Sequence, residues 1–592
     1  MNQADSAGGS SERDNFTVLT ILGLVLVGLF LVAAGTILAT WVSTAGGEIT
    51  LEETTVETES GLELAATIHR PADVSADNPA PAVTLIHGYT GEQGTMTSFA
   101  REFADRGYVA ITVDQPGHGH SDPPAFDDGW GGPAILGYAH SLDYVDEKRV
   151  AMVGHSMGGF ASLAAAETYP DGYESIVMVG STWGDDGAFE EIPRATTTFP
   201  RNLALLFTPY DEFSLSMYGE SVPANVPDSE KVRTVFGTDE AVVPGEIYGH
   251  IDAGTARWFT APPTTHTGMH RSTTTIAHTI EWVGLTTGQQ GEETSQGWYW
   301  ATVGHVLTML GVLLVAIGTT ALTWRRLRSR WSDRRWSQRA VDGIRPSRRL
   351  RIGLTALPAL TIYPLYGLGT AVVPVTRLTP QQLTHGYVLW ILGMAVIAVG
   401  TYYWRAGGSN PHLPARLSLA VERRTALLAA AVGGAITYLL VVVVGSIPGG
   451  GARMWMAGLT VLTPLRWLSL VIYGVPITVG AIAFAFGLDR VLRNDLSGFR
   501  RLVVAIFLTS GGMGLFLAVQ YAPLFFGFGL PIPSLGPLAI QAIRSMALLL
   551  VGTVLGVACN ELTDQPLVGG LLAGFVLTWI IVGTSPIHVT IL

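Results

Sequence analysis

The sequence predicts two structural units, an α/β domain built on a parallel sheet and an all-α bundle of membrane-spanning helices. Residues 43–297 alternate short apolar strands with helical stretches, which implies a parallel sheet with crossover helices. Residues 17–42 and most of 298–592 are long apolar runs, and they raise the mean hydropathy of the 592-residue chain to +0.35. Runs of this length cross a hydrocarbon layer of roughly 30 Å.

The N-terminal segment predicts a cytoplasmic tail over residues 1–16 and a transmembrane signal anchor over 17–42. A cleaved signal peptide has a shorter apolar core, a basic leader and a small-residue cleavage site. Here the leader carries one Arg, Arg13, against three acidic residues. The pattern therefore favours an anchor that is not removed.

Residues 298–592 are predicted to form a polytopic membrane domain of about eight helices, which makes about nine with the anchor. The basic loop 324–351 carries 11 Arg, loops 405–424 and 488–501 carry four each, and the intervening loops carry one or two. Because cytoplasmic loops are enriched in Lys and Arg, this alternation predicts that the N-terminus lies inside and that residues 43–297 lie outside. We expect a multi-pass protein of the cell membrane with an extracytoplasmic globular domain.

A few polar residues fall within the predicted spans, among them Arg466 and Arg544. Both are placed near the ends of their spans, where long side chains reach the interface at little cost. The sequence indicates no ion pathway through the membrane.

The predicted globular domain is strongly acidic. Residues 44–297 hold 37 Asp and Glu against 11 Lys and Arg, a net charge of 11 − 37 = −26. Dense carboxylates keep a protein solvated at high salt, so the composition is halophile-like, although a genome that favours Arg codons is an alternative explanation. Phosphates would be repelled, which argues against a nucleic-acid partner. The single Cys559 excludes an internal disulfide and a Cys-based metal site.

The strongest motif surrounds Ser156 in the pattern Gly-x-Ser-x-Gly, between an apolar strand and an Ala-rich helix. A serine at a sharp strand-to-helix turn projects its hydroxyl, and the small flanking residues let backbone segments pass closely. The following helix N-terminus favours developing negative charge. We therefore interpret Ser156 as a nucleophile.

An earlier Gly-rich turn, His87 to Gly91, follows the strand that ends at Ile86. In this position the backbone N–H of Tyr89 is expected to join that of Met157 in an oxyanion hole. A later loop contains His118 and His120, which we interpret as turn and network residues.

These motifs resemble those of the α/β-hydrolase superfamily, here fused to a polytopic membrane domain. The resemblance covers about residues 50–286 and rests on the ordered set His87-Gly88, Asp114 to Ser121 and Gly154 to Gly159, followed by an Asp and a His. The lead-in Val145 to Val150 is similar to dienelactone-hydrolase and acyl-peptidase-like branches. The resemblance specifies the superfamily well and the substrate poorly.

The superfamily pattern places an acid after a later strand and a His before the last helix. Asp211 follows an apolar strand and is the preferred acid, with Asp239 as the alternative. His266 is the preferred base, with His270 as the alternative on the pocket wall. Glu212 is expected to point away from the site. Residues 212–255 would then be an insertion, and whether they form a lid is left open.

The predicted activity is that of a serine hydrolase, either carboxylesterase/lipase-like or peptidase-like. It would cleave an ester or amide of a small-molecule, lipid or peptide substrate and needs no cofactor and no metal. Eight helices exceed what anchoring requires. The alternative is therefore a membrane transporter or scaffold with an accessory or inactive hydrolase-like domain.

Overall fold

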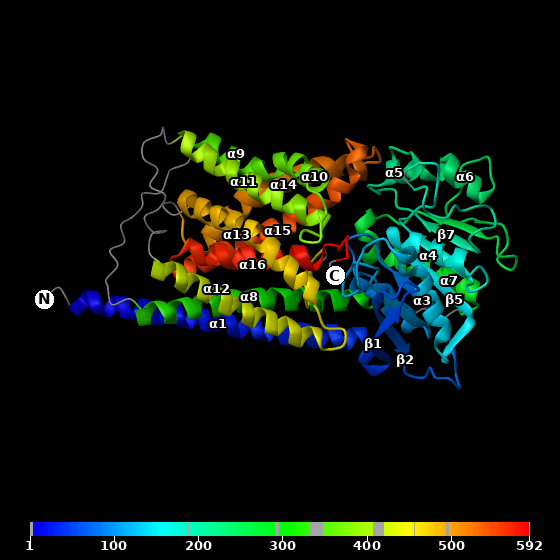
Figure 1. Cartoon of the computed structure of the whole chain (residues 1–592), viewed down its shortest axis with the longest axis horizontal. Coiled ribbons are helices and arrows are strands. Elements are labelled where there is room, and N and C mark those ends of the chain that lie inside the picture. The colour runs from blue at the N-terminus through cyan, green and yellow to red at the C-terminus, as the bar shows by residue number, and fades with distance from the viewer. Residues whose placement is uncertain are drawn as a thin grey trace.

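The computed structural model describes residues 4–187, 189–289, 295–331, 347–405, 420–454, 456–492 and 496–590. It separates a sheet domain from an elongated bundle of helices (Figure 1). The N-terminus lies at the far end of the bundle, and the C-terminus lies beside the sheet domain.

The sheet has nine strands in the described part of the chain, in the order β1-β2-β4-β3-β5-β6-β7-β9-β8. Their bounds are β1 Ile49–Glu57, β2 Glu63–Pro71, β3 Ala80–Ile86, β4 Val109–Val113, β5 Val145–His155, β6 Ser175–Val179, β7 Leu203–Leu206, β8 Ile247–Tyr248 and β9 Arg257–Thr260. The strands from β4 to β9 along this order are parallel, whereas β1, β2 and β8 pair antiparallel. The expected parallel sheet is thus confirmed, with antiparallel strands added at both edges.

Helices cover both faces of this sheet, because its central strands are apolar on both sides. In β3, Ala82 and Ile86 face one cluster of buried side chains, whereas Val83 and Leu85 face the other. The helices are α2 (Thr97–Ala104), α3 (Gly132–Ser141), α4 (Met157–Thr168), α5 (Ser214–Tyr218), α6 (Glu230–Phe236) and α7 (Thr273–Thr287). Such two-sided burial is typical of a parallel sheet with crossover helices.

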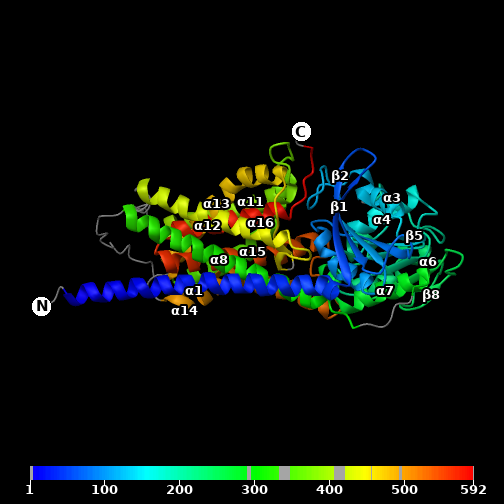
Figure 2. The ribbon, with the colours of Figure 1, turned by 90° about the horizontal axis from the view of Figure 1, so that it is seen from below.

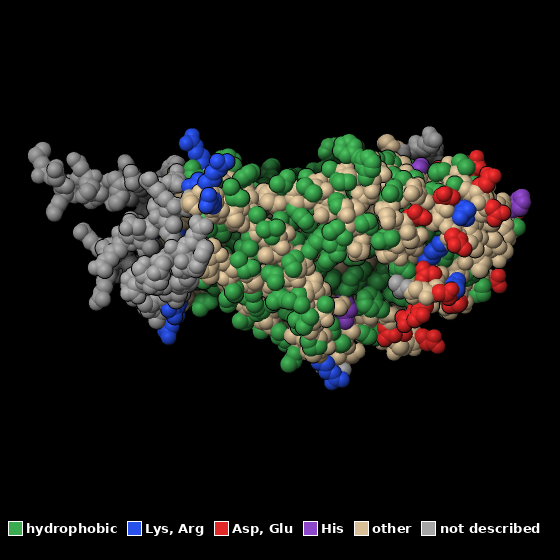
Figure 3. All heavy atoms as spheres, turned by 90° about the horizontal axis from the view of Figure 1, so that it is seen from above, with side chains coloured by type: hydrophobic (Ala, Val, Ile, Leu, Met, Phe, Trp, Pro, Cys, Tyr) green, Lys and Arg blue, Asp and Glu red, His purple; other side chains and the backbone are tan. Residues whose placement is uncertain are grey.

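Nine helices in the described residues are long and apolar enough to span a membrane, in agreement with the predicted number. Their bounds are α1 Ala4–Ser43, α8 Trp298–Trp331, α11 Gln382–Arg405, α12 Ala420–Gly445, α13 Pro464–Leu492, α14 Gly498–Phe525, α15 Gly536–Thr563, α16 Pro566–Gly583, and one composite span of α9 Arg348–Thr361, π-helix η6 Ile362–Tyr366 and α10 Gly367–Val372. On the face shown in Figure 3, apolar side chains predominate on the bundle, whereas acidic side chains gather on the sheet domain.

The helices run side by side, with their ends alternating between the sheet domain and the opposite end of the bundle (Figures 1 and 2). Helix α1 lies along α8 over most of its length. The contact depends on glycines, since a Cβ added at Gly35 would lie 2.5 Å from the Gly304 carbonyl oxygen. Small residues allow this close backbone approach, which is a main source of helix association in lipid.

Replacing Gly35 by Val is therefore expected to destabilise the α1–α8 pair by about 1–3 kcal/mol, because the added side chain overlaps the facing backbone. Gly23→Val on the same helix is the matched control, because a Cβ there meets no atom within 4 Å. The melting temperature of the full-length protein in detergent measures the difference. Equal melting temperatures for the two variants would contradict this account of the packing.

Candidate active site

Ser156 lies at the turn between β5 and α4. Its backbone adopts φ +52° and ψ −120°, a conformation with positive φ that a residue with a side chain rarely takes. Such a conformation costs on the order of 1–3 kcal/mol and persists because the surroundings fix it. Here the Ser156 N–H donates to the Val179 carbonyl oxygen over 2.9 Å, which ties the turn to the end of β6.

The two glycines of the motif are required by close contact between backbone segments. A Cβ added at Gly154 would lie 2.2 Å from the carbonyl of Gly158, and one added at Gly158 would lie 2.1 Å from the carbonyl oxygen of Ile86. Either side chain would push α4 away from the sheet. The Gly-x-Ser-x-Gly pattern thus has the steric role that the sequence predicts.

His266 and Asp211 form a buried pair. His266 begins the 3₁₀ turn η5 (His266–Arg271) after β9, and Asp211 lies in the loop after β7. The Nδ1–H of His266 donates to Asp211 Oδ2 over 2.9 Å. Burial lowers the pKa of His266, but the Asp211 carboxylate outweighs it, so the net pKa lies above the usual 6.5. The pair has the geometry of an oriented general base.

Ser156 and His266 lie at the same edge of the sheet. A Cβ added at Gly180, which follows the hydrogen-bond acceptor of Ser156, would lie 3.2 Å from His266 Nδ1. The rings of His155 and His266 have centroids 4.8 Å apart. Among the described hydrogen bonds, none joins Ser156 Oγ to His266. In ligand-free hydrolases this bond is often long and tightens when substrate binds.

The backbone around Ser156 also offers two N–H groups for an oxyanion. A Cβ added at Gly88 would lie 2.9 Å from Ser156 Cβ, so the turn that contains Tyr89 passes directly over the serine. Within the described chain, the N–H groups of Tyr89 and Met157 take part in no hydrogen bond. Both expected donors are therefore unoccupied beside the serine.

The alternative acid and the alternative base lie outside this pair. Asp239 is exposed after α6, where its backbone carbonyl accepts from Arg233 Nη1. His270 packs its ring on His155, with centroids 3.8 Å apart, and burial lowers the pKa of His270 to about 3. The acid that meets His266 is therefore the preferred one, and Asp239 stays on the surface.

The two histidines of the loop after β4 are network residues, as the sequence indicates. His118 is buried, and its ring centroid lies 5.2 Å from that of His87. His120 Nε2 lies 2.9 Å from the Val461 carbonyl oxygen, which belongs to the membrane domain. Neither ring contacts the His266 pair among the described contacts.

Glu212 does not point away from the site, contrary to expectation. Its side chain is 2% exposed, and its Oε2 accepts the backbone N–H of His266 over 2.9 Å. Its Oε1 accepts the Tyr521 hydroxyl of α14 over 2.7 Å. Burial and the neighbouring Asp211 carboxylate raise the pKa of Glu212 to about 7. No local pattern reveals this role, because Tyr521 is 309 residues away.

The membrane helices cover the sheet edge that carries these residues. Helix α5, in the insertion 212–255, contacts the turn η8 (Pro533–Leu535) that precedes α15. The candidate site thus opens toward the membrane domain. Polar contacts also join the two domains there: Arg466 Nε to the Gly119 carbonyl (2.9 Å), Arg453 to Glu92 (3.2 Å), Tyr89 Oη to His588 Nε2 (3.0 Å) and Ala125 N to the Ile587 carbonyl (2.8 Å).

Arg466 has a structural role that the sequence did not predict. The side chain is buried, so it does not reach solvent at the membrane interface. It joins the loop after β4 to the end of α16. Its guanidinium donates to four backbone carbonyls, those of Gly117, Gly119, Val582 and Ser585.

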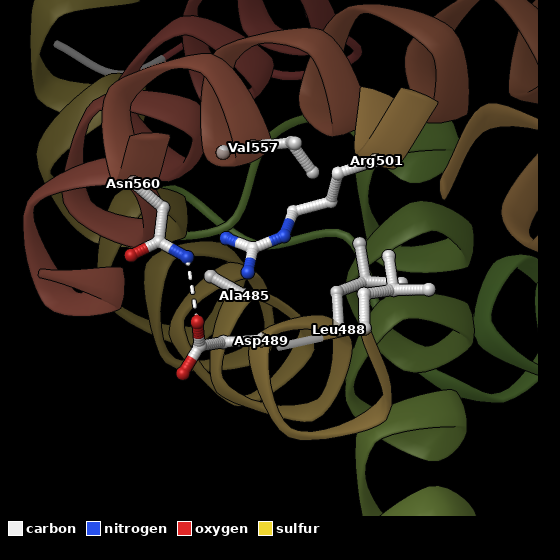
Figure 4. Close-up of a pocket in the computed structure, with 8 residues that line it drawn as sticks. Ala485, Leu488, Asp489, Arg501, Val557 and Asn560 are labelled. Atoms are coloured by element: carbon white, nitrogen blue, oxygen red, sulfur yellow. Dashed lines mark hydrogen bonds between the residues drawn. The ribbon is translucent and has the colours of Figure 1, made fainter. Parts of the chain in front are cut away.

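A separate pocket lies at the opposite end of the bundle, between the ends of α13, α14 and α15 (Figure 4). In it, Asn560 Nδ2 donates to Asp489 Oδ1 over 2.8 Å, and Arg501 reaches into the same space. The length of the helices separates this pocket from Ser156. The described residues contain no group of three or more His, Cys, Asp or Glu that could hold a metal ion.

Comparison with known proteins agrees with the fold of the sheet domain. Residues 81–202 match the family model described as alpha/beta hydrolase fold. A 2-hydroxy-6-oxononadienedioate/2-hydroxy-6-oxononatrienedioate hydrolase of Burkholderia vietnamiensis is 32% identical over 115 residues, which is 19% of this chain and 40% of the relative. A 2-(acetamidomethylene)succinate hydrolase of Mesorhizobium japonicum is 31% identical over 112 residues, 17% of this chain and 36% of the relative. The chain thus matches less than half the length of these relatives.

The family match shows that the sheet domain is of the α/β-hydrolase type, and the chain joins this domain to nine apolar helices among the residues described. The hydrolase-named relatives support a hydrolase. Among solved structures, a putative dienelactone hydrolase of Klebsiella pneumoniae is 16% identical, with a TM-score of 0.30. That match covers 41% of this chain and 99% of the solved chain.

Replacing Glu212 by Gln is expected to make stability less dependent on pH. The pKa of this carboxyl is about 7 when folded against 4.5 ordinarily, so the folded state binds an extra proton between these values. The free energy of unfolding therefore falls as pH rises through this window, by at most about 3 kcal/mol. Gln has no such titration.

Melting of the full-length protein in detergent, followed by tryptophan fluorescence over this pH range, measures the effect. The exposed Glu240→Gln is the matched control. The melting temperature of Glu212→Gln should fall less between these pH values than that of the control. The same pH dependence in both variants would argue against a protonated Glu212.

Proposed function

We propose that this protein is a membrane-anchored serine hydrolase, of carboxylesterase/lipase or peptidase type, that cleaves an ester or amide by acyl transfer. The observation that carries the proposal is the placement of Ser156, on its strained turn, and of the buried pair of His266 and Asp211 at the same edge of the sheet. Relatives named as hydrolases over part of the same domain support the reaction class.

In the first half of the reaction, Ser156 Oγ attacks the substrate carbonyl carbon while His266 Nε2 takes the hydroxyl proton. The tetrahedral intermediate then expels the alcohol or amine, which receives that proton from His266. Water attacks the resulting acyl-serine ester, and His266 accepts a proton from the water. Release of the carboxylic acid returns this proton to Ser156 Oγ.

Asp211 keeps the His266 Nδ1–H directed at its carboxylate and stabilises the imidazolium that forms in each half. The N–H groups of Tyr89 and Met157 receive the negative charge of the carbonyl oxygen. Losing one such donor typically raises the barrier by about 2.7–4 kcal/mol.

The proposed orientation has the hydrolase domain outside the cell and the N-terminus inside. The Arg-rich loops 324–351, 405–424 and 488–501 all join helix ends at the end of the bundle that is remote from the sheet domain, the end at which the N-terminus lies (Figure 1). Enrichment of Arg on the cytoplasmic side then directs the sheet domain outward. Its dense carboxylates support operation at high salt.

Ser156→Ala is expected to abolish covalent labelling of the full-length protein by a fluorophosphonate probe, because the reacting oxygen is removed. Hydrolysis of short acyl esters should fall by at least about 1,000-fold. Ser141→Ala, at an exposed position in α3, is the matched control and should behave as wild type. A wild-type protein that resists the probe would favour a transporter or scaffold with an inactive hydrolase-like domain.

Sidedness is measurable by cysteine labelling in intact cells, since the native Cys559 is buried. Asp73→Cys, at an exposed position of the sheet domain, should react with a membrane-impermeant maleimide before lysis. Ser337→Cys, in the Arg-rich loop, should react only after lysis. The reverse pattern would refute the proposed orientation.

A further inference from the structure

Arg544 is a buried charge in the membrane domain without a counter-charge. It lies in α15, about two turns from the end that faces the sheet domain, and is 1% exposed. It forms no ion pair with any carboxylate in the described residues. Its Nη2 donates to the Thr584 hydroxyl, and its guanidinium carbon lies 5.3 Å from the centre of the Tyr387 ring. Arg544 therefore does not reach solvent as the sequence led us to expect.

Two hydrogen-bond donors at this site have no acceptor among the described residues. Arg544 Nε is buried without a hydrogen-bond partner, and so is the hydroxyl of Tyr366, a residue 1% exposed in η6. The Tyr366 ring packs edge-on against Tyr387, with centroids 4.9 Å apart. The Tyr387 hydroxyl is already used, because it donates to Gln541 Oε1 over 2.9 Å. Arg544 Nε and the Tyr366 hydroxyl are thus both without an acceptor there, and both side chains pack against the Tyr387 ring.

This cluster adjoins the candidate active site. Burial raises the pKa of Tyr89 above its usual range, and the nearby Arg544 guanidinium acts in the opposite direction. Thr584, which accepts from Arg544, also lines a small cavity between the domains. On its other side this cavity is lined by Thr90 and Gly91, of the turn that contributes the proposed oxyanion donor. Arg544 is thus linked through Thr584 to a cavity that the turn containing Tyr89 also lines.

A buried guanidinium without a carboxylate is energetically unfavourable, and charges within membrane helices usually mark a ligand site. Arg binds carboxylates and phosphates through paired, charge-assisted hydrogen bonds. The unused donors of Arg544 and Tyr366 match such a group. The apolar surroundings would accept the rest of an amphiphilic molecule, since α11 and α15 are among the helices that are long and apolar enough to span a membrane.

We propose that Arg544 and Tyr366 bind an oxyanion, a carboxylate or phosphate, of the substrate whose ester or amide carbonyl reaches Ser156. The preferred substrate is then an amphiphilic acyl compound with a negative group, which can be a membrane lipid or a soluble acid. This inference rests on the proposed function and names the substrate class of the same site.

The kinetic test uses the full-length protein in detergent and mono-p-nitrophenyl esters of dicarboxylic acids, from succinate to sebacate. Each is compared with the neutral acyl ester of the same chain length. Wild type should prefer at least one anionic ester. Arg544→Gln should lower kcat/KM for that ester about tenfold or more, mainly through KM, because a charge-assisted contact is lost. The neutral ester should change less than about twofold.

Three further variants separate binding from folding. Tyr366→Phe removes a hydroxyl that has no partner in the described part of the chain, so it should weaken the anionic ester selectively and leave the melting temperature unchanged. Tyr363→Phe is the matched control, since its buried hydroxyl is likewise unpartnered there but belongs to a ring that packs on Phe516. Arg544→Lys should restore part of the selectivity.

Binding without turnover is measured on Ser156→Ala as a rise in melting temperature with dodecyl phosphate or inorganic phosphate. Stabilisation by dodecyl phosphate alone indicates that the ligand is a lipid, and stabilisation by both compounds indicates a soluble anion. Either stabilisation should disappear in the double variant that also carries Arg544→Gln. No preference for anionic esters together with no stabilisation would overturn the proposal. If Arg544→Gln affects both esters equally while fluorophosphonate labelling persists, this inference fails and the hydrolase proposal remains.

Discussion

The hydrogen bonds of Glu212 link the two domains at the point where the candidate chemistry lies. One carboxyl oxygen holds the backbone of His266, and the other accepts a hydroxyl from membrane helix α14. Because the group is buried, each oxygen needs its partner, and losing either contact would leave a polar atom unsatisfied. Glu212 therefore connects the backbone of the proposed base to a helix of the membrane domain, and residues of both domains lie at the candidate site.

This arrangement indicates that the membrane domain does more than anchor the sheet domain. A single helix would be enough to hold a hydrolase at a membrane, yet the ends of several helices cover the edge of the sheet where Ser156 lies. Arg466 and Arg453 join that edge to the bundle through carbonyls and a carboxylate. The loops between the helices thus cover the candidate site. In enzymes without a membrane domain, loops of the catalytic domain itself often have this role.

Charge is distributed unevenly along the molecule. On the face shown in Figure 3, acidic side chains gather on the sheet domain, apolar side chains predominate on the bundle, and basic side chains lie at the end of the bundle remote from the sheet domain. Within the bundle, Arg544 is buried beside the candidate site without a carboxylate in the described chain. Carboxylates on the sheet domain repel an anion, whereas the buried Arg544 guanidinium attracts one.

The sequence by itself determined the α/β class of the sheet domain, the apolar helices found in the described residues and the turn at Ser156. These are local properties: hydrophobic periodicity, run length, and glycines that a tight turn requires. The preference for Asp211 over Asp239 also came from a local strand pattern. Only the tertiary structure decided the roles of Glu212, Arg466 and Arg544, because each depends on partners far away in the chain. No local pattern encodes which helix end meets which loop of the sheet.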